Sequence, residues 1–316
     1  MIAYAIKRIL GIALIVAVIS VLIFAVTQLL PGNVAYVIAG QFASPETIAA
    51  IEAKLGLNAP AYQQYWHWAS RFITGDLGQS LIMGRPVAPL VLAAAKASAL
   101  LAGVAFVAVA LIGVSLGVLC AIRANSLVDH LGSTFAYIGI SVPEFFWGIV
   151  LVMFFSLYLG WLPADGVVAD AGFVQGALHL ILPATTLALT LVAHVSRLTR
   201  SSMLEALDSN YVRNARARGL SSRVIIVRYA LRNALIPTVT ILAIDIGWLI
   251  GGIVVVEAVF SYPGLGSLLV YSIERHDLPL IQAILLLIAV VYCASNLIAD
   301  LLYGFLNPKI RYGRAG

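Results

Sequence analysis

Two acidic residues lie within strongly apolar segments of the sequence, where an ionisable side chain needs a specific role. A charge at the centre of a lipid bilayer costs about 2.5–3.5 kcal/mol even on lenient scales, so Asp245 and Glu144 are each expected to face protein or water. Asp245 fits the wall or gate of a translocation pathway, where it would contact a substrate amine or a partner helix. It equally fits a structural hydrogen bond between helices. Glu144 follows Pro143 and fits packing beside a proline kink, with the pathway as the alternative.

Other chemistry-bearing residues form no recognisable catalytic or metal-binding motif. The sequence has no Gly-x-x-x-x-Gly-Lys-Ser/Thr loop for the phosphates of ATP and no HExxH motif. His179 and His194 lack clustered metal-ligand spacing. Cys120 and Cys293 lie inside apolar runs, where a thiol behaves as a small hydrophobic group. We therefore expect no metal, no cofactor and no enzymatic activity in this chain.

The composition requires lipid as the solvent. The chain has 316 residues, of which 62% are hydrophobic and 10% charged, with a mean hydropathy of +1.01. No polar segment is long enough to fold alone, which predicts an all-α polytopic membrane protein with a single domain over residues 1–316. The net charge of +5 is confined to short loops and indicates membrane orientation rather than nucleic-acid binding.

Six apolar segments have the length of about 20 residues that a membrane-spanning helix needs. The first is too long for the apolar core of a signal peptide and is expected to remain as an anchor. With the N-terminus inside, 14 of the 19 Lys and Arg residues lie in the cytoplasm. The positive-inside rule therefore predicts that both termini are cytoplasmic. The six segments are residues 9–30, 98–122, 135–160, 178–196, 236–257 and 280–303.

The outer loop, residues 31–96, is long enough to have a role of its own. Ser44, Pro45 and Glu46 predict a helix that begins with a serine cap and proline at its first position. An aromatic group follows and fits an interfacial belt on short helices at the membrane surface. The alternative is a docking surface for an external partner. The aromatic residues are Tyr62, Tyr65, Trp66 and Trp68.

A second long segment, residues 197–236, carries the signals for three helices. The fourth span is expected to continue to about Leu207, and a short second helix then ends at Gly219, a residue suited to the left-handed conformation. A third helix follows and enters the membrane. A short helix is thereby held across the membrane axis. The candidate cap residues are Asp208 or Ser209 for the second helix and Ser221 or Ser222 for the third.

The short helix carries a narrow, mildly apolar stripe with three- and four-residue spacing. Arg213 lies off the stripe. A stripe this small suits a socket on another protein. The alternative, an arginine-rich loop resting on anionic lipid headgroups, would not require the sequence of cap, break and cap. The stripe consists of Tyr211, Val212, Ala215 and Gly219.

Two stretches of this segment are specific in sequence. They are Asn210-Tyr-Val-Arg-Asn-Ala-Arg-Ala-Arg-Gly219-Leu220 and Ala230-Leu-Arg-Asn-Ala-Leu-Ile-Pro237. The segment resembles the coupling loop of ABC importer permeases, in the variant of the dipeptide, oligopeptide and nickel permease family. Against the broader importer pattern, Gly219 and Leu231 align, whereas Arg213 replaces an acidic residue and Arg232 replaces a proline.

Further motifs of that family occur along nearly the whole chain. The resemblance implies six spans with both ends inside, which agrees with the count from hydropathy and charge. The motifs include Leu30-Pro31-Gly32, Leu55-Gly56-Leu57, Gly75-Asp76-Leu77-Gly78, Ser141-Val142-Pro143-Glu144, Trp161-Leu162-Pro163, Leu182-Pro183-Ala184, Pro263-Gly264-Leu265-Gly266 and Asn307-Pro308-Lys309.

The resemblance implies a type I importer permease in the bacterial inner membrane, working by alternating access. Its implied solutes are di- or oligopeptides delivered by an extracytoplasmic solute-binding protein. Its implied partners also include a second homologous permease subunit and two cytoplasmic ABC ATPase subunits, which would hold ATP and Mg²⁺. In such a permease, the candidate translocation-pathway residues are Asp245 and Glu144, chosen for their acidic side chains within apolar segments. The implied ATPase-coupling residues are Tyr211, Val212, Ala215, Gly219 and Leu220.

Other solutes and another class of transporter remain as alternatives. Proteins similar to this family also import nickel chelates, glutathione and sugar conjugates. The sequence does not discriminate among these solutes. A self-sufficient secondary transporter would show inverted repeats with broken helices and more carboxylates for coupling ions. No such repeat is evident in the sequence.

Overall fold

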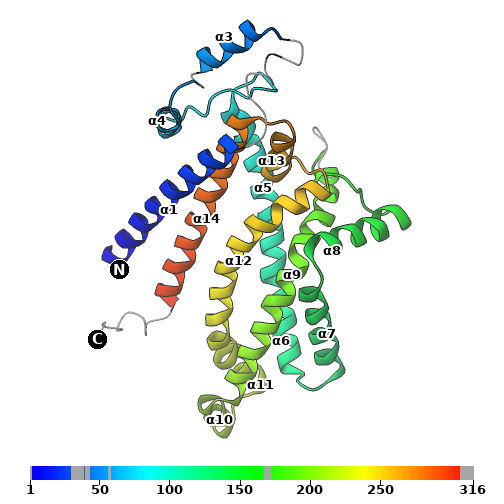
Figure 1. Cartoon of the computed structure of the whole chain (residues 1–316). Helices are drawn as coiled ribbons and strands as arrows, with labels where there is room; N and C mark the ends of the chain where they lie inside the picture. Colours follow the sequence, from blue (N-terminus) through cyan, green and yellow to red (C-terminus); the bar gives the residue numbers. More distant parts are fainter. Residues whose placement is uncertain (1, 30–38, 40–42, 56–57, 167–171, 307–316) are drawn as a thin grey trace. The chain divides into compact units, whose positions relative to one another are not determined.

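The computed structural model describes residues 2–29, 39, 43–55, 58–166 and 172–306, and most of these residues are helical (Figure 1). Four predicted motif segments lie wholly or partly outside the described residues: Leu30-Pro31-Gly32, Gly56-Leu57, much of the loop before Ser44, and Asn307-Pro308-Lys309. The chain divides into two compact units. Unit 1 comprises Met1–Ser98 and Pro263–Cys293, and unit 2 comprises Ala99–Tyr262 and Ala294–Gly316.

Unit 1 contains both ends of the outer loop and two long apolar helices. Its packed core joins the beginning of α5 to α13 and α14 through small and branched side chains such as Val91, Leu269 and Ile284. Its helices are α1 (Ile2–Leu29), α3 (Pro45–Leu55), α4 (Ala61–Ile73), the first half of α5 (Val87–Ala108), α13 (Leu265–Glu274) and most of α14 (Leu278–Leu306). The α3 helix begins as predicted, with the Thr47 amide donating to the Ser44 hydroxyl at 3.3 Å.

A buried aspartate fixes the turn between α13 and α14 in unit 1. Asp277 is wholly buried and precedes the first residue of α14. Its carboxylate accepts hydrogen bonds from the hydroxyl of Ser80 and from the amides of Leu81 and Ile82, the last two at 3.2 and 3.4 Å. The loop after α4 is therefore attached to the start of α14.

Unit 2 is organised around one long helix, α9. It runs from Phe173 to Asp208 and contacts α6, α7, α8 and α12. Within the most apolar 18-residue stretch of α9, 56% is buried inside the protein, compared with 11% for the corresponding stretch of α1. The helices of unit 2 are the end of α5, η1 (Val109–Gly113), α6 (Val114–Ile122), α7 (Leu127–Ser141), α8 (Glu144–Leu151), η2 (Val152–Tyr158), α9, α10 (Asn210–Ala217), α11 (Ser222–Val224), η3 (Ile225–Ala230), α12 (Leu231–Val259) and the end of α14.

Five helical stretches of the described chain are long and apolar enough to cross a membrane, and a bent pair of helices makes up to six. The count agrees with the six predicted spans. The third predicted span, residues 135–160, is not a single rod: α7 and the helix formed by α8 and η2 meet at 109° around Val142 and Pro143. A residue before proline avoids helical geometry, and Val142 is extended with ψ 131°.

Three segments, η1, η2 and η3, are π-helical. Two of them, η1 and η3, continue directly into the α-helices α6 and α12, whereas η2 ends the helix that α8 begins. A π-turn contains one residue more than an α-turn, because each amide bonds five rather than four residues back. The segments η1 and η3 therefore shift the faces of the helices that follow them. The segment η3 follows α11, the first turn of the helix after Gly219.

Candidate functional site

The segment predicted to carry the function forms the three helices expected of it. α9 ends at Asp208, α10 follows after Ser209, and a continuous helix begins at Ser222. Ser209 and Ser221 occupy the cap positions, but neither side chain caps its helix. The hydroxyl of Ser209 instead donates to the carbonyl of Ala206 at 2.5 Å. Gly219 has φ +77°, the left-handed conformation that glycine adopts without a steric cost.

The short helix α10 is seated on the beginning of the next helix. Val212 and Ala215 are 0% and 3% exposed and pack with Ile225, while Leu220 and Tyr229 border this cluster. Two of the four stripe residues, Val212 and Ala215, are therefore turned inward, whereas Tyr211 and Gly219 are exposed. Val212 and Ala215 position α10, because the helix after Gly219 folds back and covers them.

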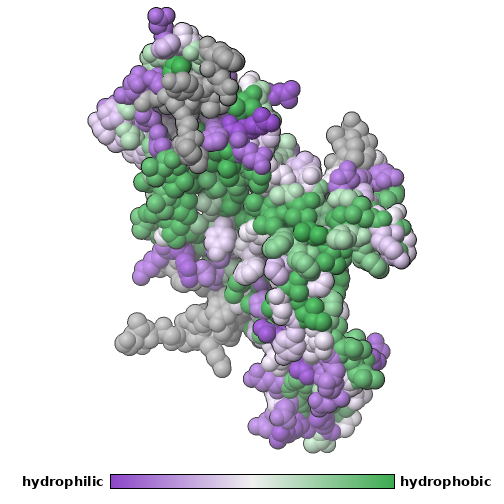
Figure 2. Space-filling view, turned by 45° about the vertical axis from the view of Figure 1, so that its right-hand side comes forward, coloured by the Kyte–Doolittle hydropathy of each residue, from purple (hydrophilic) through white to green (hydrophobic). Residues whose placement is uncertain are grey.

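The outer side of α10 is polar and positively charged. Tyr211, at 39% exposed, is the only one of the five predicted coupling residues described as a large exposed hydrophobic side chain. Arg213 pairs with Asp208 at 2.9 Å, and both side chains are mostly solvent-exposed. Figure 2 shows hydrophilic side chains gathered at the end of unit 2 that carries α10. The surface offered to a partner thus combines one aromatic ring with arginines.

Asp245 is buried on α12 with one carboxylate oxygen lacking a partner among the described residues. It is 1% exposed. Its Oδ1 lies 3.5 Å from Nδ1 of His194 on α9, whereas its Oδ2 accepts no hydrogen bond from the described part of the chain. The hydroxyl of Thr190, one turn earlier on α9, is buried and similarly lacks a described partner.

Glu144 lies at the start of α8, against α12. A Cβ on Gly252 would come within 2.6 Å of both carboxylate oxygens of Glu144, so the carboxylate occupies the space that glycine leaves. Its Oε1 and the indole nitrogen of Trp147 are buried and have no partner in the described ranges. Because Gly252 follows Asp245 by two helical turns, the structure brings the two predicted pathway carboxylates to one side of α12.

The glycines of α6 mediate a close helix crossing. A Cβ on Gly117 would lie 2.5 Å from the carbonyl oxygen of Ser196, and one on Gly113 would lie 3.0 Å from the Cβ of Val195. These glycines also bracket Ser115 in a Gly-x-Ser-x-Gly sequence. The segment lies within helix rather than at the strand-to-helix turn that exposes a hydrolase nucleophile. Helix packing accounts for this motif.

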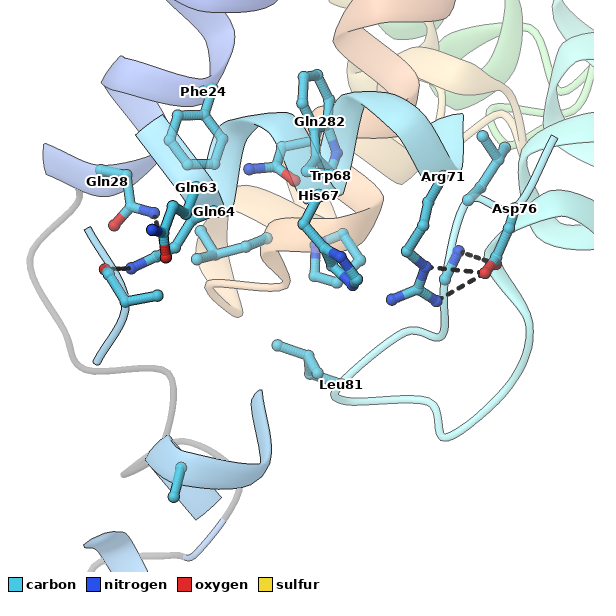
Figure 3. Close-up of a pocket in the computed structure, with 16 residues that line it drawn as sticks. Phe24, Gln28, Gln63, Gln64, His67, Trp68, Arg71, Asp76, Leu81 and Gln282 are labelled. Atoms are coloured by element: carbon cyan, nitrogen blue, oxygen red, sulfur yellow. Dashed lines mark hydrogen bonds and ion pairs between the residues drawn. The ribbon is translucent and has the colours of Figure 1, made fainter. Parts of the chain in front are cut away.

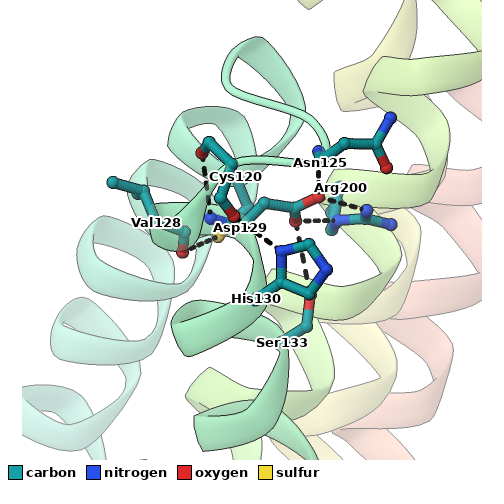
Figure 4. Close-up of polar contacts among 8 residues, drawn as sticks. Cys120, Asn125, Val128, Asp129, His130, Ser133 and Arg200 are labelled. Carbon is teal, nitrogen blue, oxygen red and sulfur yellow. Dashed lines mark hydrogen bonds and ion pairs between the residues drawn. The ribbon is translucent and has the colours of Figure 1, made fainter.

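Unit 2 contains an ion pair that the sequence did not reveal. Arg200 of α9 donates through Nε and Nη2 to the two carboxylate oxygens of Asp129 on α7, at 2.5 and 2.6 Å (Figure 4). The two residues are 71 positions apart, so no local spacing rule joins them. The one available signal was an arginine and an aspartate, each near the end of a predicted span.

Unit 1 contains an open pocket of about 530 Å³ between α1, α4 and the beginning of α14 (Figure 3). Amide side chains, including Gln282, and the rings of Phe24 and Trp68 line it. Arg71 and Asp76 pair at its rim at 2.7 Å. Two hydrogen bonds lower the pKa of Asp76: the larger effect comes from the amide of Gly78, and the next from the guanidinium of Arg71.

The predicted aromatic group packs partly inward, because the Tyr65 hydroxyl lies 2.9 Å from Ser20 Oγ.

His179 and the two cysteines make packing contacts, as expected for residues that are not metal ligands. His179 Nδ1 lies 3.0 Å from the carbonyl oxygen of Asp165. Cys120 and Cys293 are buried free thiols. No group of three or more metal-ligating side chains occurs within the described residues.

These features define a multi-pass helical membrane protein, and comparison with known families specifies its kind. The sequence model of the family "Binding-protein-dependent transport system inner membrane component" matches residues 113–312. The N-terminal model of such membrane components matches residues 1–93. The chain therefore belongs to this family of inner-membrane transport components, the permease subunits of ABC importers, as the sequence predicted.

Individual relatives extend over the whole chain. The glutathione transport system permease protein GsiC of Escherichia coli O6:H1 (strain CFT073) is 41% identical over 312 residues, covering 99% of this chain and all of that protein. The proteins of the same name from Escherichia coli K12 and Shigella dysenteriae serotype 1 are each 40% identical with the same coverage.

The fold resembles that of a solved transporter structure. The crystal structure of an amino acid ABC transporter with histidines superposes with a TM-score of 0.52 at 16% sequence identity, covering 68% of this chain and 93% of that chain. The chain is thus a multi-pass inner-membrane permease subunit that works with other components of an ABC importer. Its predicted coupling residues, pathway residues and orientation stay predictions.

Proposed function

We propose that this chain forms half of the translocation pathway of an ABC importer for peptide-like solutes, and that α10 docks on a cytoplasmic ATPase subunit. The observation that carries the proposal is the position of α10. It follows α9 in the chain after Ser209, and Val212 and Ala215 seat it on the start of the helix that continues as α12. A push on α10 therefore acts on α12 through this packing and on α9, around which the unit is built, through the chain itself.

The length of α9 supports a position of α10 outside the lipid. Its 36 residues correspond to about 54 Å of helix at 1.5 Å per residue, whereas the hydrocarbon core is about 30 Å thick. The helix therefore extends beyond the membrane. The excess of arginines around α10 favours the cytoplasmic side.

ATP and Mg²⁺ belong to the partner ATPase subunits in this proposal, because the chain has no loop that could cradle phosphates. This chain itself catalyses no reaction. The remaining partners are a second homologous permease subunit, which completes the pathway, and an extracytoplasmic binding protein, which delivers the solute. Alternating access then follows from ATP-driven movement of α10 in both permeases.

The relatives favour a solute of the peptide class. Three of them are named as glutathione permeases, and glutathione is a tripeptide with a free amino group. The unpartnered carboxylate oxygens of Asp245 and Glu144 are suited to an ammonium group, which needs acceptors when it leaves water. We infer that both residues face the pathway when it opens and that glutathione or another short peptide is the solute.

The coupling proposal is tested by ATP hydrolysis of the reconstituted importer with and without loaded binding protein. Tyr211→Ala removes the exposed ring of α10 and should abolish stimulation while the complex still assembles. Tyr158→Ala is the matched control, since Tyr158 is 79% exposed on η2, and should leave stimulation intact. Equal stimulation in all three proteins would contradict the role of α10.

The solute proposal is tested by uptake into proteoliposomes. Glutathione and dipeptides should be transported in an ATP-dependent manner, and Asp245→Asn should reduce their uptake more than the ATPase rate. Uptake of a nickel chelate or a sugar conjugate in place of peptides would assign the solute to another class. Uptake by this chain alone, without ATP, would establish a secondary transporter.

A further inference from the structure

The Asp129–Arg200 pair is joined to several further polar groups of unit 2. Asp129 is 3% exposed, and its carboxylate also accepts from the amide of Asn125 at 2.9 Å and the hydroxyl of Ser133 at 3.4 Å (Figure 4). Its own amide donates to the Ser126 hydroxyl, which caps α7. The turn between α6 and α7 is therefore organised around this carboxylate, and Arg200 attaches it to α9.

The pair lies beside a close crossing of α6 and α9. The close crossing at Gly117 reaches the backbone nitrogen of Arg200, which would lie 3.1 Å from a Cβ at that glycine. One turn further along α9, Met203 and Ala206 pack with Ala121 of α6 and with Ala230 and Ala234, in η3 and α12. The same stretch of α9 thus holds the α6–α7 turn on one side and the helix that seats α10 on the other.

Only one partner of this ion pair is buried: the Arg200 side chain is 30% exposed, whereas Asp129 is almost fully enclosed. Burial of the carboxylate removes most of its hydration, and well-packed apolar side chains of similar size are frequently as stable as a desolvated pair or more stable. What a bidentate arginine–carboxylate pair adds is a fixed direction and distance between two helices. Apolar contacts permit sliding, whereas this geometry does not.

We propose that Asp129 and Arg200 are positioning residues for transport, which make the α6–α7 turn move with α9 when α10 is pushed. The proposal rests on the function proposed for α10. Without the pair, force applied at α10 still moves the end of α9 but is no longer passed fully to α6 and α7. ATP hydrolysis then continues while less solute is carried for each ATP.

The test is the ratio of solute transported to ATP hydrolysed, measured on the same proteoliposomes of the complete importer. Asp129→Asn keeps the shape of the side chain and removes its charge, and should lower the ratio about fivefold or more. Arg200→Lys keeps the charge but loses the paired donors, and should give an intermediate ratio. Arg200→Lys also tests the proposal if the importer that carries Asp129→Asn does not assemble.

A matched control exists in unit 1. Arg71 and Asp76 also bond through Nε and Nη2, but on the surface, with side chains 49% and 54% exposed. Asp76→Asn makes the same charge change and should leave the ratio unaltered. If Asp129→Asn and Arg200→Lys assemble and transport and hydrolysis stay unchanged or fall in equal proportion, the pair is structural only and the proposal is overturned.

Tyr211→Ala, measured in parallel, separates this inference from the proposed function. Loss of stimulation by Tyr211→Ala together with an unchanged ratio in Asp129→Asn would overturn the inference and leave the docking role of α10 in place. Normal stimulation in Tyr211→Ala would overturn that docking role, and with it the route by which the pair is proposed to act.

Discussion

The side chain of Asp277 is wholly buried, and its carboxylate accepts three hydrogen bonds. Aspartate placed directly before an apolar helix is a usual cap signal, yet its bonds here go to a loop almost 200 residues earlier. The residue therefore has a long-range role that its local sequence does not reveal.

Asp277→Ala should destabilise unit 1 strongly. The change leaves the hydroxyl of Ser80 and two amides buried without their acceptor, which costs about 1–3 kcal/mol. Thermal unfolding of the purified protein in detergent measures the loss. Ser80→Ala removes a single donor and should cost less. An equal cost for the two variants would show that the backbone amides find other partners.

Gly117→Ala should destabilise unit 2 through overpacking. A Cβ there would lie 2.5 Å from the carbonyl oxygen of Ser196, so α6 and α9 must separate. Such overpacking costs about 1–3 kcal/mol. Gly176→Ala is the control, because a Cβ at that position of α9 meets nothing within 4 Å and alanine favours a helix. A lower melting temperature for Gly117→Ala only is the expected result.

Tyr262 should titrate later than an ordinary tyrosine. Burial, and then the negative charge of Glu257, raise its pKa to about 12, from a usual value of about 10. Because the folded state favours the neutral phenol, this stabilisation is complete below pH 10 and is lost as pH rises towards 12. Phenolate absorbance of the protein and of Tyr262→Phe should differ only in the late part of the titration. A difference centred near pH 10 would show that the phenol is not shielded.

At the scale of elements, α10 separates two kinds of residue that the sequence placed in one stripe. Val212 and Ala215 hold the helix, and Tyr211 is exposed. Val212→Asp should release α10 from its seat and increase hydrogen exchange of residues 209–221, because a charge would be buried against Ile225. Tyr211→Ala should leave that exchange low. Similar exchange in both variants would contradict the distinction.

The sequence predicted the boundaries of the helices in this segment better than which side of each helix is buried. Ser209, Gly219 and Ser221 marked the boundaries correctly, because cap and left-handed positions depend on local backbone geometry. The inward side of α10 depends on Ile225, the first residue of η3, which reaches α10 only because the chain reverses after Gly219. The Asp129–Arg200 pair depends on a tertiary contact between α7 and α9. Neither is encoded in local spacing.

At the scale of the whole molecule, the predicted orientation is open to a direct test. Both cysteines are free and buried, so Cys120→Ala and Cys293→Ala provide a background without thiols. In it, Thr74→Cys should react with an impermeant maleimide in intact spheroplasts. Arg218→Cys should react only after permeabilisation, since the arginine-rich side is expected to be cytoplasmic. The opposite pattern would invert the orientation.

The π-helical segments have a consequence for how this chain tolerates changes in length. Each of η1 and η3 contains one residue more than an α-helix needs over the same turn, and each has helix on both sides. Deleting one residue inside such a segment, for example Val227 in η3, would convert it to an α-helix while the flanking faces keep their registers. Length variation among related chains should therefore concentrate at these two positions within the membrane helices. Elsewhere in a packed helix, a single deletion would rotate the face that follows by about 100°.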